Sequence, residues 1–238
     1  MELNLSMEGT VEDGQYQTNN KGYIRQVKHY NKLLRKILVD DFSKDVLDKI
    51  FKDTLEEFKY VLPTIPCVGQ EENPHMPKIV VAAYFLTLYK FMKEQGVTPV
   101  EMGKIIYDVT IMNVSRTPRI LRWAKRKSFF SEKNVDILQK LGMESKKNRN
   151  HEDFIFDVKI KNEGELCVTY RCCPIIKYYM ENGGEELAPY VCALDIAIGK
   201  ALGTGVKVSK TIGWGNNYCD FSYKEGREVN HYDFNKVG

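Results

Sequence analysis

The run Cys167-Val168-Thr169-Tyr170-Arg171-Cys172-Cys173-Pro174-Ile175 changes from a strand pattern into a helix start. Residues 167–172 alternate as a strand does. Proline fits the first turn of a helix, so Pro174 predicts a helix that continues to about Met180. Cys173 would then lie at the N-cap of this helix, where the positive end of the helix dipole favours a thiolate.

A second helix is predicted over about residues 185–202, and it contains Cys192 and Asp195. Residues three apart share a helix face, so this thiol and this carboxylate should point the same way. The neighbouring residues are apolar, and a buried carboxylate is costly unless hydrogen-bond donors surround it. Asp195 therefore needs backbone N–H groups, a hydroxyl group such as that of Thr211, or a ligand.

Strand patterns flank the two helices on both sides. Residues 154–160 alternate and pair back with 166–172, and a strand over 206–212 turns into a closing strand over 218–223. The order ββααββ predicts an α+β C-terminal half, an antiparallel sheet with helices on one face. On the closing strand we expect Cys219 to face the helices, with Cys192 and Asp195, and Asp220 to face the other side.

The N-terminal half has helical periodicity. Helices are expected over about 23–41, 43–60, 77–95, 98–112 and 135–141, with Ser43 as an N-cap and Thr98-Pro99-x-Glu101 as a capping box. We therefore predict a loose leader over 1–20, a helical region over 21–145 packed on the sheet, and an α+β region over 146–238. The helical region and the α+β region form either two separate domains or one compact domain.

A proline-rich loop over residues 62–77 contains Cys67 and the polar run Asn73-Pro74-His75, directly before an apolar helix. Two interpretations stay open for this run. His75 meets a ligand at the N-terminal end of the helix, or Asn73 caps the helix while His75 makes a local hydrogen bond.

Six basic residues lie within residues 116–127, and Ile120, Trp123 and Ala124 form the apolar seam of that stretch. Basic residues beside a tryptophan are found in nucleic-acid sites, but the amphipathic layout and a net charge of only +3 favour a solvated basic face. A further alternative is that one arginine reaches a pocket and pairs with a substrate carboxylate.

The composition is that of a soluble globular protein, with 43% hydrophobic and 28% charged residues. The start of the chain lacks a basic segment followed by an apolar run, and no apolar stretch reaches the length needed to cross a membrane. We expect a cytoplasmic protein with a small-molecule partner and with neither a nucleic-acid nor a membrane partner. A homo-oligomer stays open.

Five of the six cysteines lie between Val158 and Tyr223. Free cysteines often only fill a core, and disulfides are rare in cytosolic proteins. The chain has no Cys-x-x-Cys pair, so we expect neither a metal nor a cofactor, although a metal at the Cys/Asp cluster stays open. The candidates for chemistry are Cys173, Cys192 and Asp195, with Cys219 and Thr211 beside them.

At these residues the sequence resembles the bacterial L-2-amino-thiazoline-4-carboxylic acid hydrolase family. The resemblance covers about residues 63–223 and rests on these motifs: Cys173-x-Ile175, Glu186-Leu187-Ala188-Pro189 leading into Cys192-x-x-Asp195, the closing Thr211…Gly215…Cys219-Asp220-Phe221, and Asn73-Pro74-His75 upstream. The closing Gly-x-x-x-Cys-x-Phe is also similar to 4-vinyl-reductase-type domains, which bind small hydrophobic ligands in a TRAPP-like fold.

The first resemblance implies a hydrolase that opens a C–N or C–S bond of a small heterocycle. Cys173 would be the nucleophile and Asp195 would orient a group or move a proton, while Cys192 and Cys219 line the pocket. Asn73, His75 and Thr211 would contact the substrate. The second resemblance implies a binding or sensor module without turnover, whose cysteines pack or sense redox state or metal.

Overall fold

The structure is a computed structural model that describes residues 11–12, 15–16, 20–66, 76–147, 153–161, 164–229 and 233–234. Contacts divide the chain into two compact units, residues 1–96 and 97–238, and each is described by itself. The division falls after Gly96, whereas the sequence placed the join near residue 145. The helices over 97–145 group with the sheet because α4 packs along α9 and α6 packs against β3, as defined below.

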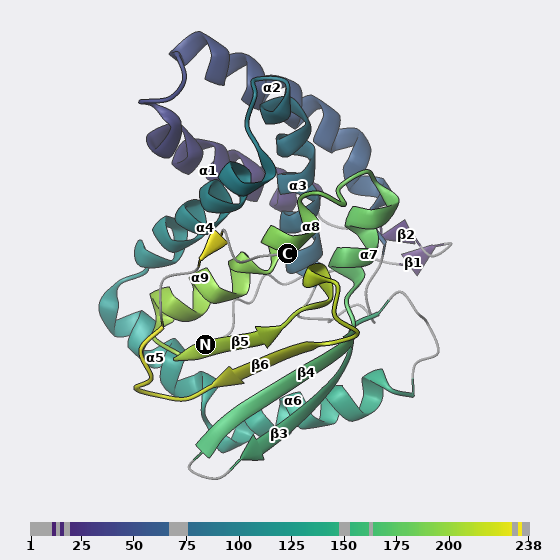
Figure 1. Cartoon of the computed structure of the whole chain (residues 1–238), viewed down its shortest axis with the longest axis vertical. Coiled ribbons are helices and arrows are strands. Elements are labelled where there is room, and N and C mark those ends of the chain that lie inside the picture. The colour runs from purple at the N-terminus through teal and green to yellow at the C-terminus, as the bar shows by residue number, and fades with distance from the viewer. Residues whose placement is uncertain are drawn as a thin grey trace. The chain divides into compact units, whose positions relative to one another are not determined.

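The first unit is mainly helical (Figure 1). Its elements are β1 (Val11–Glu12), β2 (Gln15–Tyr16), α1 (Asn20–Leu38), α2 (Lys44–Val61), the 3-10 turn η1 (Leu62–Thr64) and α3 (Met76–Lys93). Ser43 caps α2 as predicted, because its hydroxyl accepts a hydrogen bond from the Val46 N–H at 3.4 Å.

The core of the first unit is aromatic. Tyr84 is fully buried, and its hydroxyl donates a hydrogen bond to the side chain of Asn31. The ring of Phe58 meets the Tyr84 ring edge-on at 5.7 Å. Thirteen of the eighteen residues of α3 are buried, as expected for a helix that is apolar nearly all round.

The second unit contains the remaining helices. They are α4 (Pro99–Ser115), α5 (Arg119–Phe129), α6 (Glu132–Ser145), α7 (Pro174–Glu181), α8 (Ala188–Val191), α9 (Ala193–Leu202) and the 3-10 turn η3 (Ile212–Trp214). Both halves of the predicted capping box are present: the Glu101 N–H donates to the Thr98 hydroxyl at 3.3 Å, and the Thr98 N–H donates to the Glu101 carboxylate at 2.8 Å.

The sheet of this unit has four antiparallel strands in the order β3-β4-β6-β5. They are β3 (Ile155–Lys161), β4 (Glu165–Cys172), β5 (Val206–Lys210) and β6 (Cys219–Tyr223). Figure 1 shows α9 lying over one face of this sheet. The arrangement confirms the predicted α+β fold.

The core of the second unit lies between the sheet and α9, with α4 on the far side of α9. Ala193 and Ala197 of α9 pack against Phe221 of β6 and Tyr107 of α4. Small residues permit this close packing. A Cβ atom on Gly199 would lie 2.4 Å from a methyl group of Val206, so α9 contacts β5 directly.

Helix α5 is turned the other way round from the prediction. Ile120 and Trp123, expected in a buried seam, are 68% and 49% exposed, and no residue of α5 is fully buried. Arg122 and Arg126, expected on a solvated face, are partly buried instead. Throughout the described part of the chain, the helices are too short or too polar to cross a bilayer.

Candidate functional site

Cys173 lies where β4 ends and α7 begins. Its backbone is extended (φ −129°, ψ 102°), and its carbonyl accepts the first hydrogen bond of the helix, from the Lys177 N–H at 3.1 Å. Pro174 takes the first helical position, as the sequence predicted, because proline cannot donate at a place where no acceptor is available. Cys173 is therefore the N-cap, and the residue is partly buried.

Cys192 and Asp195 lie where α8 meets α9. The sequence predicted one helix here, whereas the structure has a short α8 and then α9, with Cys192 as the N-cap of α9. The backbone at Cys192 stays in the right-handed helical region (φ −64°, ψ −14°), so its spacing to Asp195 is still that of one helix face. Asp195 thereby stands in the first turn of α9, where the helix dipole favours a carboxylate.

Turn η3 holds Thr211 against α8. A Cβ atom on Gly213 would lie 2.6 Å from the Ala188 carbonyl oxygen, so only glycine allows this approach. The Trp214 indole N–H donates to the Pro189 carbonyl at 2.9 Å and fastens the same contact. Thr211 is fully buried, and its hydroxyl accepts a hydrogen bond from the Trp214 N–H at 3.1 Å.

Cys219 opens β6 and faces the helices. It is 3% exposed and packs with residues of α9, and its sulfur accepts a hydrogen bond from the Ile212 N–H at 3.2 Å. Asp220 lies on the other face, where the Ser209 hydroxyl donates to its carboxylate at 2.8 Å. The predicted orientation of these two neighbouring side chains is confirmed, and it follows from the alternation of a strand.

The three thiols and the carboxylate lie close enough to influence one another. The negative charge of Asp195 raises the pKa of the Cys173, Cys192 and Cys219 thiols alike. Cys173 and Cys219 both also act on Cys192. The structure therefore brings together four of the predicted site residues, and Thr211 joins them through its hydroxyl, which lowers the pKa of Cys192.

Burial sets the protonation state of this cluster. It is the main cause that raises the pKa of Cys173 from 9.0 to about 12 and that of Cys219 to about 11. The pKa of Cys192 is also raised well above 9.0, again mainly by burial. All three groups are therefore neutral thiols at physiological pH.

The prediction of a thiolate at Cys173 is wrong for the resting protein. The backbone amides of Ile176 and Ile175 do lower the pKa of Cys173, which is the expected effect of a helix start. Burial outweighs them because removing a thiolate from water costs more than two amide donors return.

A family model described as L-2-amino-thiazoline-4-carboxylic acid hydrolase matches residues 78–223. This match covers more than half of the chain. The chain belongs to this family. Comparisons with curated proteins and with solved structures found no match. The part matched to the hydrolase family contains Cys173, Cys192, Asp195, Thr211 and Cys219.

Tyr223 was missed by the sequence reasoning. Burial is the main cause of its raised pKa, and Asp195 adds to it, so its hydroxyl lies within the electrostatic reach of the cluster. The signal was present in the sequence: Cys219, Phe221 and Tyr223 alternate along β6 and share one face.

Other predicted residues lie outside the cluster or outside the description. Asn73, His75 and Cys67 lie outside the described residues. Among the residues that are described, no three His, Cys, Asp or Glu side chains are arranged to hold a metal ion. Cys167 pairs with Lys159 and Ser222 across the strands and so faces away from α9.

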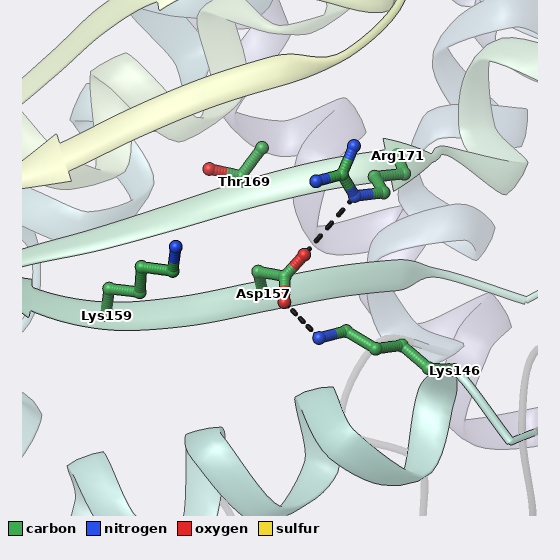
Figure 2. Close-up of a pocket in the computed structure, with 5 residues that line it drawn as sticks. All are labelled: Lys146, Asp157, Lys159, Thr169 and Arg171. Atoms are coloured by element: carbon green, nitrogen blue, oxygen red, sulfur yellow. Dashed lines mark hydrogen bonds and ion pairs between the residues drawn. The ribbon is translucent and has the colours of Figure 1, made fainter.

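The outer face of the sheet has a hollow of about 380 Å³, lined by Lys146, Asp157, Lys159, Thr169 and Arg171. Figure 2 shows Asp157 between two cations. Its carboxylate accepts hydrogen bonds from the Lys146 ammonium group and from Arg171 Nε, the latter at 3.3 Å. Thr169 pairs with Asp220, so this hollow and the thiol cluster lie on opposite faces of the sheet.

Proposed function

We propose that this member of the family is a hydrolase that opens the ring of a small thiazoline carboxylate at the Cys/Asp cluster. One observation carries the proposal: three thiols and one carboxylate, from the start of α7, the start of α9 and β6, lie within electrostatic reach of one another in the segment matched to the family. A carboxylate beside a thiol provides the two groups needed for covalent hydrolysis, a nucleophile and a proton acceptor.

The reaction divides into two steps. In the first, Cys173 Sγ forms a bond to the ring carbon between nitrogen and sulfur, and its proton moves to Asp195. The ring C–S bond then breaks, and the ring sulfur takes that proton and becomes a free thiol. In the second, water attacks the carbon held on Cys173, and the cysteine leaves with a proton from that water. One water is consumed, and no atom is oxidised or reduced.

The neutral resting thiol suits this scheme. At a pKa of about 12 the proton of Cys173 has to leave as the S–C bond forms, so the acceptor must already face the thiol. The positively charged amidine of an aminothiazoline would lower the pKa of the thiols beside it, opposing the effect of Asp195. The substrate would thus activate its own nucleophile.

The remaining residues take supporting roles in this proposal. Cys192 and Cys219 would contact the substrate beside Cys173, and the Thr211 hydroxyl forms a hydrogen bond with Cys192.

The direct test is turnover of 2-amino-thiazoline-4-carboxylate, followed by the appearance of a free thiol in the product. We expect thiol release by the wild-type protein and its loss in Cys173→Ala and Asp195→Asn. Cys172→Ala is the matched control, since it removes the neighbouring thiol at the end of β4 and should keep the rate. Equal rates for the wild-type and Cys173→Ala proteins would exclude the nucleophile role.

A second candidate function is binding without turnover, as in a small-molecule sensor. It is favoured by the enclosure of two of the thiols, since Cys192 and Cys219 are only 8% and 3% exposed. Native mass spectrometry of the purified protein separates the two functions. A retained small molecule together with no thiol release would favour the sensor.

A further inference from the structure

Helix α5 exposes its apolar residues to solvent. Ile120 is 68%, Leu121 40% and Trp123 49% exposed. With about 100° between successive residues, these three side chains and Ala124 span one arc of the helix, and exposed Lys127, whose ammonium group pairs with Glu225 at 3.0 Å, stands at the C-terminal end of the same arc. Large apolar side chains gathered on one helix face mark an interaction surface more often than isolated ones do. We call Ile120, Leu121, Trp123 and Ala124 the α5 stripe.

Specific contacts fix this orientation from the opposite side of α5. The Arg122 guanidinium donates to the Ala201 carbonyl at 3.1 Å, near the end of α9, where helix carbonyls lack partners. Arg126 Nε lies 3.3 Å from a Glu225 carboxylate oxygen. The Phe129 ring meets the Tyr223 ring edge-on at 5.0 Å. These contacts hold the α5 stripe outward.

Positive charge surrounds the α5 stripe. The sequence has no acidic residue between Asp108 and Glu132 and six basic ones, all within residues 116–127. Arg119 and Lys125 are exposed and project on either side of the stripe. Neither forms an ion pair with another described residue, so their charges are available to a partner.

We propose that α5 docks the second unit on an anionic lipid surface, with the α5 stripe among the acyl chains and the flanking cations at the phosphates. A helix with Trp, Ile and Leu on one face and Lys or Arg beside them is typical of interfacial helices. Trp and Arg side chains have an apolar body and a polar tip, which suits the boundary between chains and headgroups.

The charge pattern argues against two copies of this chain meeting through α5. A two-fold contact would place each stripe against its own copy and bring Arg119 and Lys125 near the same cations of the partner. Like charges at a contact are unfavourable, whereas anionic headgroups complement them. The proposal departs from the expectation of no membrane partner, which rested on the lack of a spanning segment. It is independent of the proposed function.

The test is co-sedimentation of the whole protein with vesicles. We expect binding to equimolar phosphatidylglycerol and phosphatidylcholine at about 0.1 M salt, where the Debye length is about 10 Å, and loss of binding at about 1 M salt. Vesicles of phosphatidylcholine alone should bind at least tenfold less. The double variant Arg119→Gln, Lys125→Gln should bind about fivefold less for each charge removed.

Apolar variants test the insertion itself. Ile120→Ser and Trp123→Ala should each weaken binding at least threefold, and neither should change thermal unfolding, because both residues are exposed. Ile160→Ser and Tyr60→Ala are matched controls, since they alter exposed apolar residues on other elements, 56% and 76% exposed. The chain has two tryptophans, so a fluorescence blue shift on vesicles should disappear in Trp123→Phe and remain in Trp214→Phe.

Three results would overturn the proposal. The wild-type protein fails to bind anionic vesicles at low salt, or the stripe variants bind as tightly as wild type. The third is a concentration-dependent dimer that Ile120→Ser abolishes, because this would assign the stripe to a second copy of the chain.

Discussion

Alkylation of Cys173 across a range of pH tests the central electrostatic feature of the site. Only the thiolate reacts with iodoacetamide at a useful rate. With a pKa of about 12 instead of 9.0, Cys173 has about 1000-fold less thiolate near neutral pH than an ordinary cysteine. Its alkylation rate should therefore rise about tenfold for each pH unit, with no plateau up to about pH 10.

Peptide mass spectrometry follows Cys173 and its neighbour Cys172 in one experiment. Cys172 is partly buried, and burial raises its pKa, so it is a matched internal reference of similar position. The same protein unfolded in denaturant gives the rate of the unprotected thiol. Enclosure alone would lower the alkylation rate of Cys173 by the same factor at every pH. A raised pKa instead shifts the plateau of that rate to higher pH. A plateau for Cys173 below about pH 9 would refute the reasoning.

Three further outcomes follow from the same contacts. The folded pKa values of Cys173 and Cys219 exceed 9.0, so their contribution to stability is complete below pH 9 and is lost as pH rises toward 11 to 12. The denaturant concentration at the midpoint of unfolding should therefore decrease as the pH rises from about 9 to about 11. Gly213→Ala should lower the free energy of unfolding by about 1–3 kcal/mol because its Cβ would meet a backbone carbonyl. Gly215→Ala has φ +80° and open space around the Cβ, so it should lower the free energy of unfolding by about 1 kcal/mol through backbone strain alone. Equal losses for the two variants in denaturant titrations would contradict this. The Asp157 pKa is lowered mainly by the hydrogen bond from Lys146, so the contribution of Asp157 to stability is present above pH 3.8 and is lost as the pH falls below that value. Asp157→Asn should lower the free energy of unfolding by about 1 kcal/mol or less at neutral pH, and the stability of this variant should depend less on pH in the acid range.

Local chemistry made part of the fold predictable. The capping box at Thr98 and the cap at Ser43 depend on side chains that lie within three residues of their partners. Alternation in β3, β4 and β6 fixed both the hairpins and the face that Cys219 occupies. These features need no information from distant parts of the chain.

Distant contacts decided what the sequence could not predict. The apolar and basic residues of α5 fit either orientation of an amphipathic helix. Arg122 and Arg126 turn inward because the Ala201 carbonyl accepts a hydrogen bond from Arg122 and the Glu225 carboxylate forms an ion pair with Arg126. The prediction of a thiolate at Cys173 depended on the helix start, whose backbone amides do lower the pKa of Cys173. Burial by the enclosing residues raises that pKa by more. Neither the acceptors nor the enclosure is visible in the residues beside these positions.

The charge balance of the cluster restricts the ligands that fit the proposed function. One carboxylate stands among three neutral thiols, and its charge raises the pKa of each of them. A ligand with a cationic amidine would be attracted to Asp195 and would lower those pKa values at the same time. A neutral or purely anionic heterocycle would gain neither effect. In the proposed reaction the amidine end of an aminothiazoline would therefore lie beside Asp195, and the ring carbon that Cys173 would attack belongs to that same amidine.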